Sequence, residues 1–191
     1  MIMKEISSIP LILSLFLIVA CNDRKNYVPK PPTYLRIAFP ERSYDVHEDN
    51  CKFKFEKPNY FTVKEVEPST CHRDISFGEY NGTLHLSYIP MDTSLAAYIN
   101  HAIDKVDEHK VKATAIRDTN FIVKDNKVFG TFFELQGNVA SPFQFYLTDS
   151  TTIFLSGVVY FNARPNYDSI RPVLKYVKSD IYRMIETLEW K

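Results

Sequence analysis

Glycine is scarce in this chain, with 5 among 191 residues, and neither sign of charge is in excess, because 23 Lys and Arg residues balance 23 Asp and Glu residues. A formally neutral chain has no net field that would favour nucleic acid or an anionic membrane surface. The aromatic residues are abundant by contrast, with 14 Phe and 12 Tyr. This composition indicates a β-rich, well-packed domain and argues against disorder.

Familiar catalytic motifs are also missing. The sequence contains no GxSxG elbow, no Walker loop, no dinucleotide-binding glycine pattern and no HExxH. We therefore expect no catalytic residue, no cofactor and no bound metal, and we predict that the protein is not an enzyme. An enzyme assembled from residues far apart in the sequence is the alternative that motifs leave open.

The longest apolar run is short. Residues 11–21 (LILSLFLIVAC) follow Lys4 and make up little more than half of the roughly 20 residues that a spanning helix needs. A basic start, a short apolar core and a small residue before the cleavage site are typical of a secretory signal. Residues 18–21 (IVAC) resemble a bacterial lipobox, so we expect residues 1–20 to be removed and Cys21 to carry lipid. The alternative is an ordinary signal peptide with a chance cysteine.

A proline-rich segment follows the cysteine. Residues 21–33 contain Pro29, Pro31 and Pro32, which disfavour a helix and predict a stiff, extended tether. We expect residues 34–191 to form a single globular domain, with its first residues, up to Tyr44, laid on it as an extended arm. Two or more acyl chains would hold such a protein stably at a bilayer.

Two cysteines remain once Cys21 is assigned to lipid. Cys51 and Cys71 are an even pair in an oxidising compartment, which favours a disulfide. Chain entropy gives such a bond a contribution on the order of 3 kcal/mol. A metal site or a catalytic thiol is the competing interpretation, although the pair lacks CxxC spacing.

Hydrophobic periodicity predicts an α+β fold. Alternation with a period of two predicts strands at residues 51–55, 61–66, 74–80, 83–89, 120–124, 127–137, 143–148 and 152–161. Spacings of three and four predict helices at 94–111 and 169–188, the second capped by Ser169 with Pro172 in its first turn. Asn81-Gly82 predicts a two-residue hairpin turn. We expect an antiparallel sheet covered by two main helices, an order of elements that resembles the PsbP-like α/β/α sandwich.

The strands after residue 120 carry a further prediction. Their short connections indicate an antiparallel meander. Residues 127–137 and 152–161 are apolar on both sides, so we expect these strands to be covered on both faces.

The histidines form no ligand pattern. The chain contains His47, His72, His85, His101 and His109. His101 and His109 lie too far apart on the predicted helix to share a ligand set. We expect each histidine to have a surface or structural role.

Two polar clusters invite a functional interpretation. Residues 144–149 (QFYLTD) lead into Ser150, and for Asp149 and Ser150 turn chemistry is the favoured explanation. The second cluster follows the last strand. Its dense polar and aromatic residues suit a partner-binding loop, although turn chemistry is the alternative. The candidate residues are Asn162, Arg164, Asn166, Tyr167 and Asp168.

Together these motifs resemble the gliding-motility lipoprotein D family (GldD) of Bacteroidetes over nearly the whole chain. The matching stretches are the lipobox with Cys21, residues 29–37 with Pro40, Cys51 with Cys71, and residues 144–149, 160–162, 165–169 and 186–190. The resemblance implies a non-enzymatic component of the gliding machinery, which is tied to type IX protein secretion. No catalytic residues come with this family.

The sequence thus predicts an envelope lipoprotein with a structural or assembly role. Its expected partners are the membrane, through the lipid, and other gliding and secretion proteins, but not nucleic acid. We expect the outer membrane, because Asn22 stands where the inner-membrane retention signal known in enteric bacteria has Asp. We expect its periplasmic side, because residues 22–25 (NDRK) are not clearly acidic, as surface-export tags in Bacteroidetes are. The rival hypothesis is a lipid-anchored, periplasmic small-ligand-binding module or hydrolase built on the sheet. A third is a peptidoglycan-associated structural protein.

Overall fold

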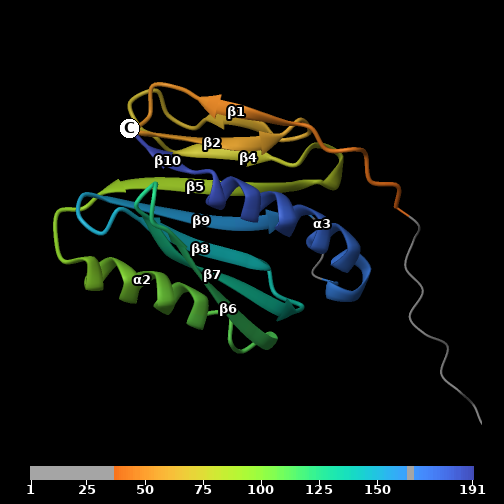
Figure 1. Ribbon diagram of the computed structural model, residues 1–191. Coiled ribbons are helices and arrows are strands. Elements are labelled where there is room, and N and C mark those ends of the chain that lie inside the picture. Colours follow the sequence, from red (N-terminus) through yellow and green to blue (C-terminus); the bar gives the residue numbers. More distant parts are fainter. Residues whose placement is uncertain (1–36, 163–165) are drawn as a thin grey trace, which may run out of the picture. The chain divides into compact units, whose positions relative to one another are not determined.

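The computed structural model describes residues 37–162 and 166–191, which form two antiparallel sheets and two main helices (Figure 1). The predicted α+β class, an antiparallel sheet with two main helices, is confirmed. Cys21, Arg164 and the predicted signal and tether segments lie outside the described residues.

The larger sheet has seven strands, and each neighbouring pair is antiparallel. Their order across the sheet is β3 (Thr62–Glu65), β4 (Arg73–Ser76), β5 (Gly82–Pro90), β9 (Ile153–Phe161), β8 (Phe143–Thr148), β7 (Val128–Gly137) and β6 (Ala113–Val123). The run β6–β7–β8–β9 follows the chain, which confirms the predicted meander. β5 pairs with β9 and so joins the earlier strands to this meander.

A smaller sheet of three strands was not foreseen as a separate layer. It consists of β1 (Tyr44–Glu48), β2 (Phe53–Pro58) and β10 (Glu189–Trp190), with β2 in the centre. The predicted strand at 51–55 is the start of β2, which therefore belongs to this sheet and not to the larger one. The last residues of the chain complete it, because Trp190 is paired with Phe53.

The two helices are α2 (Leu95–Asp107) and α3 (Tyr167–Glu186). The predicted cap of α3 is wrong, because Asn166 occupies the N-cap and its Oδ1 accepts a hydrogen bond from the Ser169 amide at 3.3 Å. Pro172 consequently lies inside the helix, in the second turn, where it removes one intrahelical hydrogen bond. α2 ends at Asp107, short of the predicted 111.

The main core lies between one face of the larger sheet, strand β2 and helix α3. Apolar residues of α3 at the predicted helical spacing are buried there, namely Leu174, Val177, Ile181, Met184 and Ile185. They pack against an aromatic-rich layer that includes Phe53, Phe55, Phe61, Phe77, Phe132 and Phe143. β8 is buried on both faces for most of its length. The cover on both faces that was predicted for residues 127–137 and 152–161 is found in part, because β9 is fully buried on both faces only at residues 153–155 and β7 is mostly half-buried.

The turn between β4 and β5 differs from the predicted two-residue hairpin. Ser76 is paired with Thr83, and a short 3-10 helix at Gly78–Tyr80 fills the connection. The Phe77 amide donates to the Gly82 carbonyl at 2.9 Å. Asn81 adopts a left-handed conformation with φ of 51°, which asparagine tolerates better than most residues. The predicted hairpin between these strands is therefore confirmed, but the predicted two-residue turn is wrong.

The arm before β1 is laid along α3, as predicted for the part that is described. The Phe39 ring stacks on Tyr176 with centroids 4.3 Å apart, and the Tyr176 hydroxyl donates to the Pro40 carbonyl at 3.0 Å. Arg42 donates to the Tyr176 carbonyl and to the Ser179 hydroxyl. Asp180 of α3 forms an ion pair with Arg42 and accepts a hydrogen bond from the hydroxyl of Tyr44, the first residue of β1.

Candidate functional site

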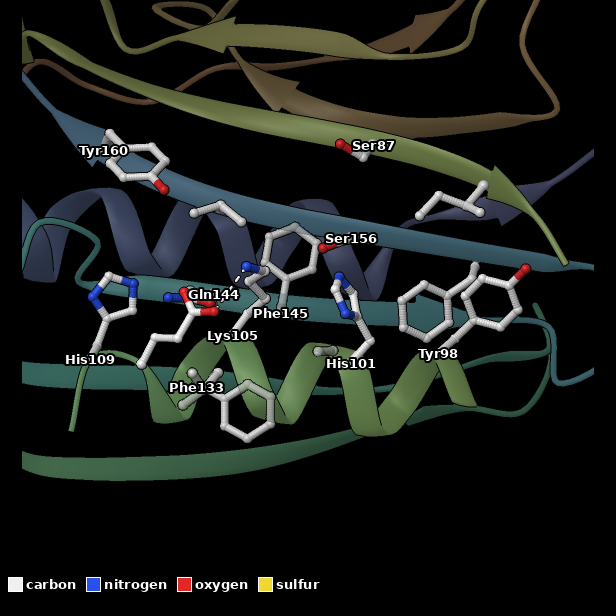
Figure 2. A pocket seen from close by; sticks show the side chains of 16 residues that line it. Ser87, Tyr98, His101, Lys105, His109, Phe133, Gln144, Phe145, Ser156 and Tyr160 are labelled. Carbon is white, nitrogen blue, oxygen red and sulfur yellow. Dashed lines mark hydrogen bonds and ion pairs between the residues drawn. The ribbon is translucent and has the colours of Figure 1, made fainter. Parts of the chain in front are cut away.

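A groove of about 440 Å³ lies between α2 and the face of the larger sheet that is turned away from α3 (Figure 2). α2 and the turn after it line the groove from Tyr98 to His109, and the helical part, from Tyr98 to Val106, spans about 12 Å at the usual helical rise. Strands β5, β8 and β9 supply most of the floor. Small-molecule sites in proteins commonly have volumes of roughly 300–1,000 Å³, so the groove is large enough for a ligand.

α2 is held over the sheet mainly near its two ends. Towards its C-terminus, Val106 packs with Leu135 and Val139. Towards its N-terminus, the Tyr98 ring lies 5.4 Å from the ring of Phe154. Within α2, whose residues are all described, Val106 alone is buried, and Ile103 of the predicted apolar face is 40% exposed. The middle of the helix therefore borders the groove instead of packing on the sheet.

The floor of the groove is polar at its centre. Ser87 and Ser156 are paired residues on β5 and β9, and Gln144 comes from the neighbouring strand β8. Gln144 is only 5% exposed, and no described residue forms a hydrogen bond with its carboxamide. Among the described residues, His47 Nε2 is the one fully buried side-chain polar atom without a hydrogen-bond partner, so the Gln144 carboxamide is not sealed from the groove that it lines. A polar group that enters the groove can therefore form hydrogen bonds with Gln144.

The rim carries the charged and aromatic side chains. On the helix side, His101, Lys105 and His109 point along the groove, and Lys105 Nζ forms an ion pair with Glu108 Oε1 at 2.9 Å (Figure 2). The hydrogen bond from Lys105 is the main reason that the Glu108 pKa lies below its ordinary value. On the sheet side, Tyr160 is 42% exposed. The pair of opposite charges leaves the rim nearly balanced at neutral pH.

The predicted partner-binding loop is adjacent to α3 instead of the groove, and its described residues have local roles. Asn162 bonds Asn81 in both directions, through its amide and its carbonyl. Asn166 caps α3, and the Tyr167 amide donates to Asn138 Oδ1 at 3.2 Å. Asp168 lies in the first turn of α3, where a carboxylate suits the helix dipole. The binding role of this loop stays a prediction.

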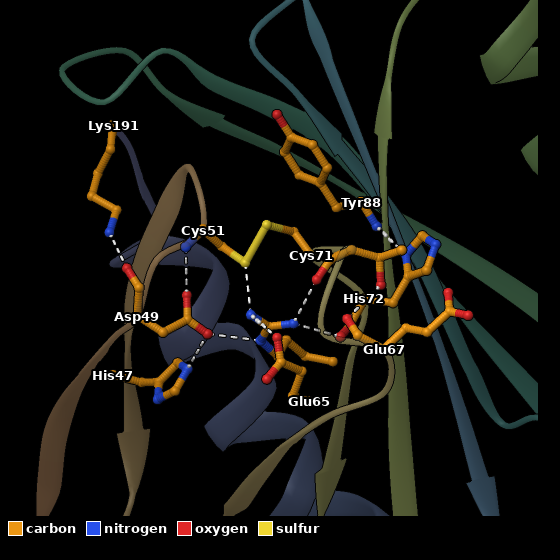
Figure 3. The surroundings of a disulfide bond; sticks show 11 residues. His47, Asp49, Cys51, Glu65, Glu67, Cys71, His72, Tyr88 and Lys191 are labelled. Carbon is orange, nitrogen blue, oxygen red and sulfur yellow. Dashed lines mark hydrogen bonds and ion pairs between the residues drawn. A yellow bond between two sulfur atoms is a disulfide. The ribbon is translucent and has the colours of Figure 1, made fainter.

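Cys51 and Cys71 are joined by a disulfide, as predicted, with their Cα atoms 5.6 Å apart (Figure 3). The buried Arg73 guanidinium lies beside it, donating to Cys51 Sγ at 2.8 Å and to Asp49 Oδ2 at 2.7 Å. Burial on its own raises the Asp49 pKa, but the hydrogen bonds from Arg73 and from the Cys51 amide outweigh it, and the net pKa is lowered. The disulfide, Arg73 and Asp49 thus form one cross-link between two loops.

The turn at Asp149 has the structural role that was expected. Its carboxylate accepts hydrogen bonds from the amides of Thr151, Thr152 and Ile153 at 2.8–2.9 Å and from both threonine hydroxyls. Burial alone would raise the Asp149 pKa, but these hydrogen bonds hold it well below its ordinary value. The carboxylate therefore stabilises the β8–β9 hairpin.

Asp149→Ala is expected to lower the unfolding free energy by about 1–3 kcal/mol, because three amides lose their acceptor. The folded-state pKa is depressed, so this stabilisation is present above the ordinary carboxyl pKa and is lost as the pH falls below it. Urea unfolding of the protein and the variant at pH 7 and pH 3 checks both statements. Equal stability of the two at pH 7 would contradict the prediction.

Within residues 37–162 and 166–191, no group of three or more His, Cys, Asp and Glu side chains is placed to hold a metal ion. His72 accepts the Tyr88 amide at 3.1 Å, and His85 contacts Asp74 at 2.6 Å. His101 and His109 line the same groove, although the sequence suggested no connection between them. The polar stretch at 144–149 is visible in the sequence, but its place in one groove with α2 and β5 depends on the fold.

The structure thus defines an α+β domain with a ligand-sized groove on one sheet face, preceded in the sequence by a lipobox. No helix in the described part of the chain is both long and apolar enough to cross a bilayer. The family model for gliding motility lipoprotein GldD matches residues 24–190, so the chain belongs to this family and is a gliding-motility lipoprotein. This confirms the family that the motifs indicated. A comparison with curated proteins gave no match.

Proposed function

We propose that the protein is a lipid-anchored, non-enzymatic component of the gliding apparatus and of the type IX secretion system linked to it in Bacteroidetes. It acts there as a structural or assembly factor. The observation that carries the proposal is the family match over residues 24–190. The disulfide and the aromatic-rich core support the proposal, because a well-packed, cross-linked domain is suited to a scaffold role.

The proposed location is the periplasmic side of the outer membrane. The lipid on Cys21 supplies the anchor, and the proline-rich residues up to 33 supply the spacing from the membrane. The neutral charge of the chain is consistent with an attachment that depends on lipid, not on anionic headgroups.

Deletion of the gene followed by complementation tests the proposed function. We expect the deletion strain to lose colony spreading and the secretion of type IX substrates, and the intact gene to restore both. In a strain that does not glide, secretion is the readout. Normal spreading and normal secretion in the deletion strain would overturn the proposal.

Cys21→Ser is expected to abolish incorporation of labelled fatty acid into the protein, because the thioether to diacylglycerol requires the cysteine sulfur. The measurement is metabolic labelling followed by purification. The double variant Cys51→Ser/Cys71→Ser is the matched control and should keep its label. A labelled Cys21→Ser protein would show that the lipid is attached elsewhere.

A further inference from the structure

The floor of the groove offers hydrogen bonds of both kinds. The Gln144 carboxamide has a donor and an acceptor end, and the hydroxyls of Ser87 and Ser156 can each do both. Gln144 is 5% exposed and lines the groove, and its carboxamide forms no hydrogen bond with the described residues. The floor therefore suits an uncharged ligand that itself carries donors and acceptors.

The main chain of the floor cannot recognise an extended peptide. Recognition of such a peptide uses unpaired backbone groups at a sheet edge. Here β9 lies between β5 and β8, and the ladders run through Ser87, Ser156 and Gln144. The backbone groups at these positions are already used within the sheet, so side chains alone remain to bind a ligand.

An acyl chain and a phosphorylated ligand fit less well. A saturated chain would cover Gln144 and the two serines without bonding them, and burying polar groups in this way is unfavourable. A polyanion needs uncompensated cations, but the one lysine of the lining, Lys105, is paired with Glu108 at 2.9 Å. The chemistry of the lining thus favours a neutral, polar ligand.

Part of the lining matches the apolar faces of sugar rings. Ile89, Val158 and Ala102 present aliphatic groups next to the polar floor, and the half-exposed Tyr160 ring lies at one end of the groove (Figure 2). Pyranose rings combine C–H faces with hydroxyl edges, so that a ring can contact both kinds of surface at once. The lining residues run from Tyr98 to His109 along α2 and the turn after it, so the groove has room for more than one ring.

We infer that the groove between α2 and strands β5, β9 and β8 binds a linear glycan that contains acetamido sugars. Gln144 pairs with an acetamido group, amide to amide, while Ser87 and Ser156 bond ring hydroxyls. This binding site goes beyond the proposed assembly role and does not depend on it. The ligand chemistry is shared by murein glycan strands and by surface polysaccharides with N-acetylated sugars.

Binding is measured with the full-length protein in detergent, by titration calorimetry with a tetramer of N-acetylglucosamine. The tetramer should bind, and a glucose tetramer that lacks the acetamido groups should bind at least about tenfold more weakly, because Gln144 is then left unpaired. Competition with soluble murein fragments and with surface-polysaccharide fragments from the same cells identifies the natural source as the competitor that displaces the tetramer.

Gln144→Leu should weaken tetramer binding by about tenfold or more, while thermal unfolding shows a stability equal to or above that of the parent. Gln136→Leu is the matched control, because Gln136 lines a separate hollow beside α3 and should leave binding unchanged. Ala102→Trp provides a second route, since an indole on the helix side fills the groove and should also abolish binding.

The inference is overturned if the folded protein does not bind the tetramer, or if Gln144→Leu and Ala102→Trp bind it as the parent does. It is equally overturned if dodecanoate or an unstructured peptide binds in the groove and the tetramer does not displace it. These results concern purified protein alone, so they are distinguishable from a failure of the spreading and secretion assays.

Discussion

Asp180→Ala is expected to lower the unfolding free energy by about 3–5 kcal/mol, the usual cost of breaking a buried charged network by removing one partner. Asp180 is fully buried on α3, where it accepts hydrogen bonds from the hydroxyls of Tyr44 and Tyr60 and forms an ion pair with Arg42, whose Nε lies 2.9 Å from Oδ1. These partners belong to the arm, to β1 and to the turn after β2. One carboxylate therefore joins three segments to α3, and urea unfolding measures its contribution.

Asp180→Asn is the matched control, because it keeps the shape and one acceptor but removes the charge. Burial, followed by the hydrogen bond to Asp180, raises the Tyr44 pKa from 10.0 to about 12, and the Tyr60 pKa is raised for the same reasons. The folded protein therefore favours the neutral phenols. Their contribution to the unfolding free energy is fully present below pH 10 and is lost as the pH rises towards 12. The asparagine variant should show a weaker loss over this range. If the Asp180→Ala variant is as stable as the parent, then the buried carboxylate does not hold the three segments to α3.

The double variant Cys51→Ala/Cys71→Ala is expected to lose about 3 kcal/mol, because the cross-link no longer restricts the unfolded chain. For a domain of this size, the loss corresponds to a decrease in Tm of roughly 6–12 °C. Scanning calorimetry of the parent and the variant measures it. The side chain of Cys51 is itself buried, so a small packing loss adds to the effect.

Reduction of the parent protein with a dithiol should reproduce most of the change in Tm without any change of sequence. The same reagent should leave the Tm of the double variant unchanged, so this variant controls for effects of the reagent that do not involve the disulfide. If the Tm of the reduced parent equals that of the oxidised parent, then Arg73 and Asp49 hold the two loops together without the disulfide.

Local patterns predicted most of the larger sheet and both helices. β8 was predicted to the residue, because its alternation and its flanking turns agree. β1 was missed because YDVHE is largely exposed and its alternation is limited to Tyr44 and Val46, so it becomes a strand only by pairing with β2. β10 is too short to give any period. Tertiary pairing decides such elements, and a sequence window cannot show it.

The groove could not be predicted from local sequence patterns, for a related reason. Ser87, Gln144 and Ser156 come from three strands that are distant in the sequence, and only the pairings β5–β9 and β8–β9 bring them together. The apolar spacing of α2 indicated a packed helix face and gave no sign that the face borders a cavity. In contrast, the roles of Asp149 and of the disulfide depend on nearby residues, and the sequence was sufficient for both.

Tension on the lipid anchor has a defined path through the domain. A pull on the chain ahead of Ile37 reaches Phe39 and Arg42 first, and these residues are fastened to α3. α3 passes the load to the core and the smaller sheet, on the face of the larger sheet opposite to α2. The attachment of the arm and the groove thus lie on opposite faces of the seven-stranded sheet, so a load that enters through the arm is carried by the α3 side of the domain.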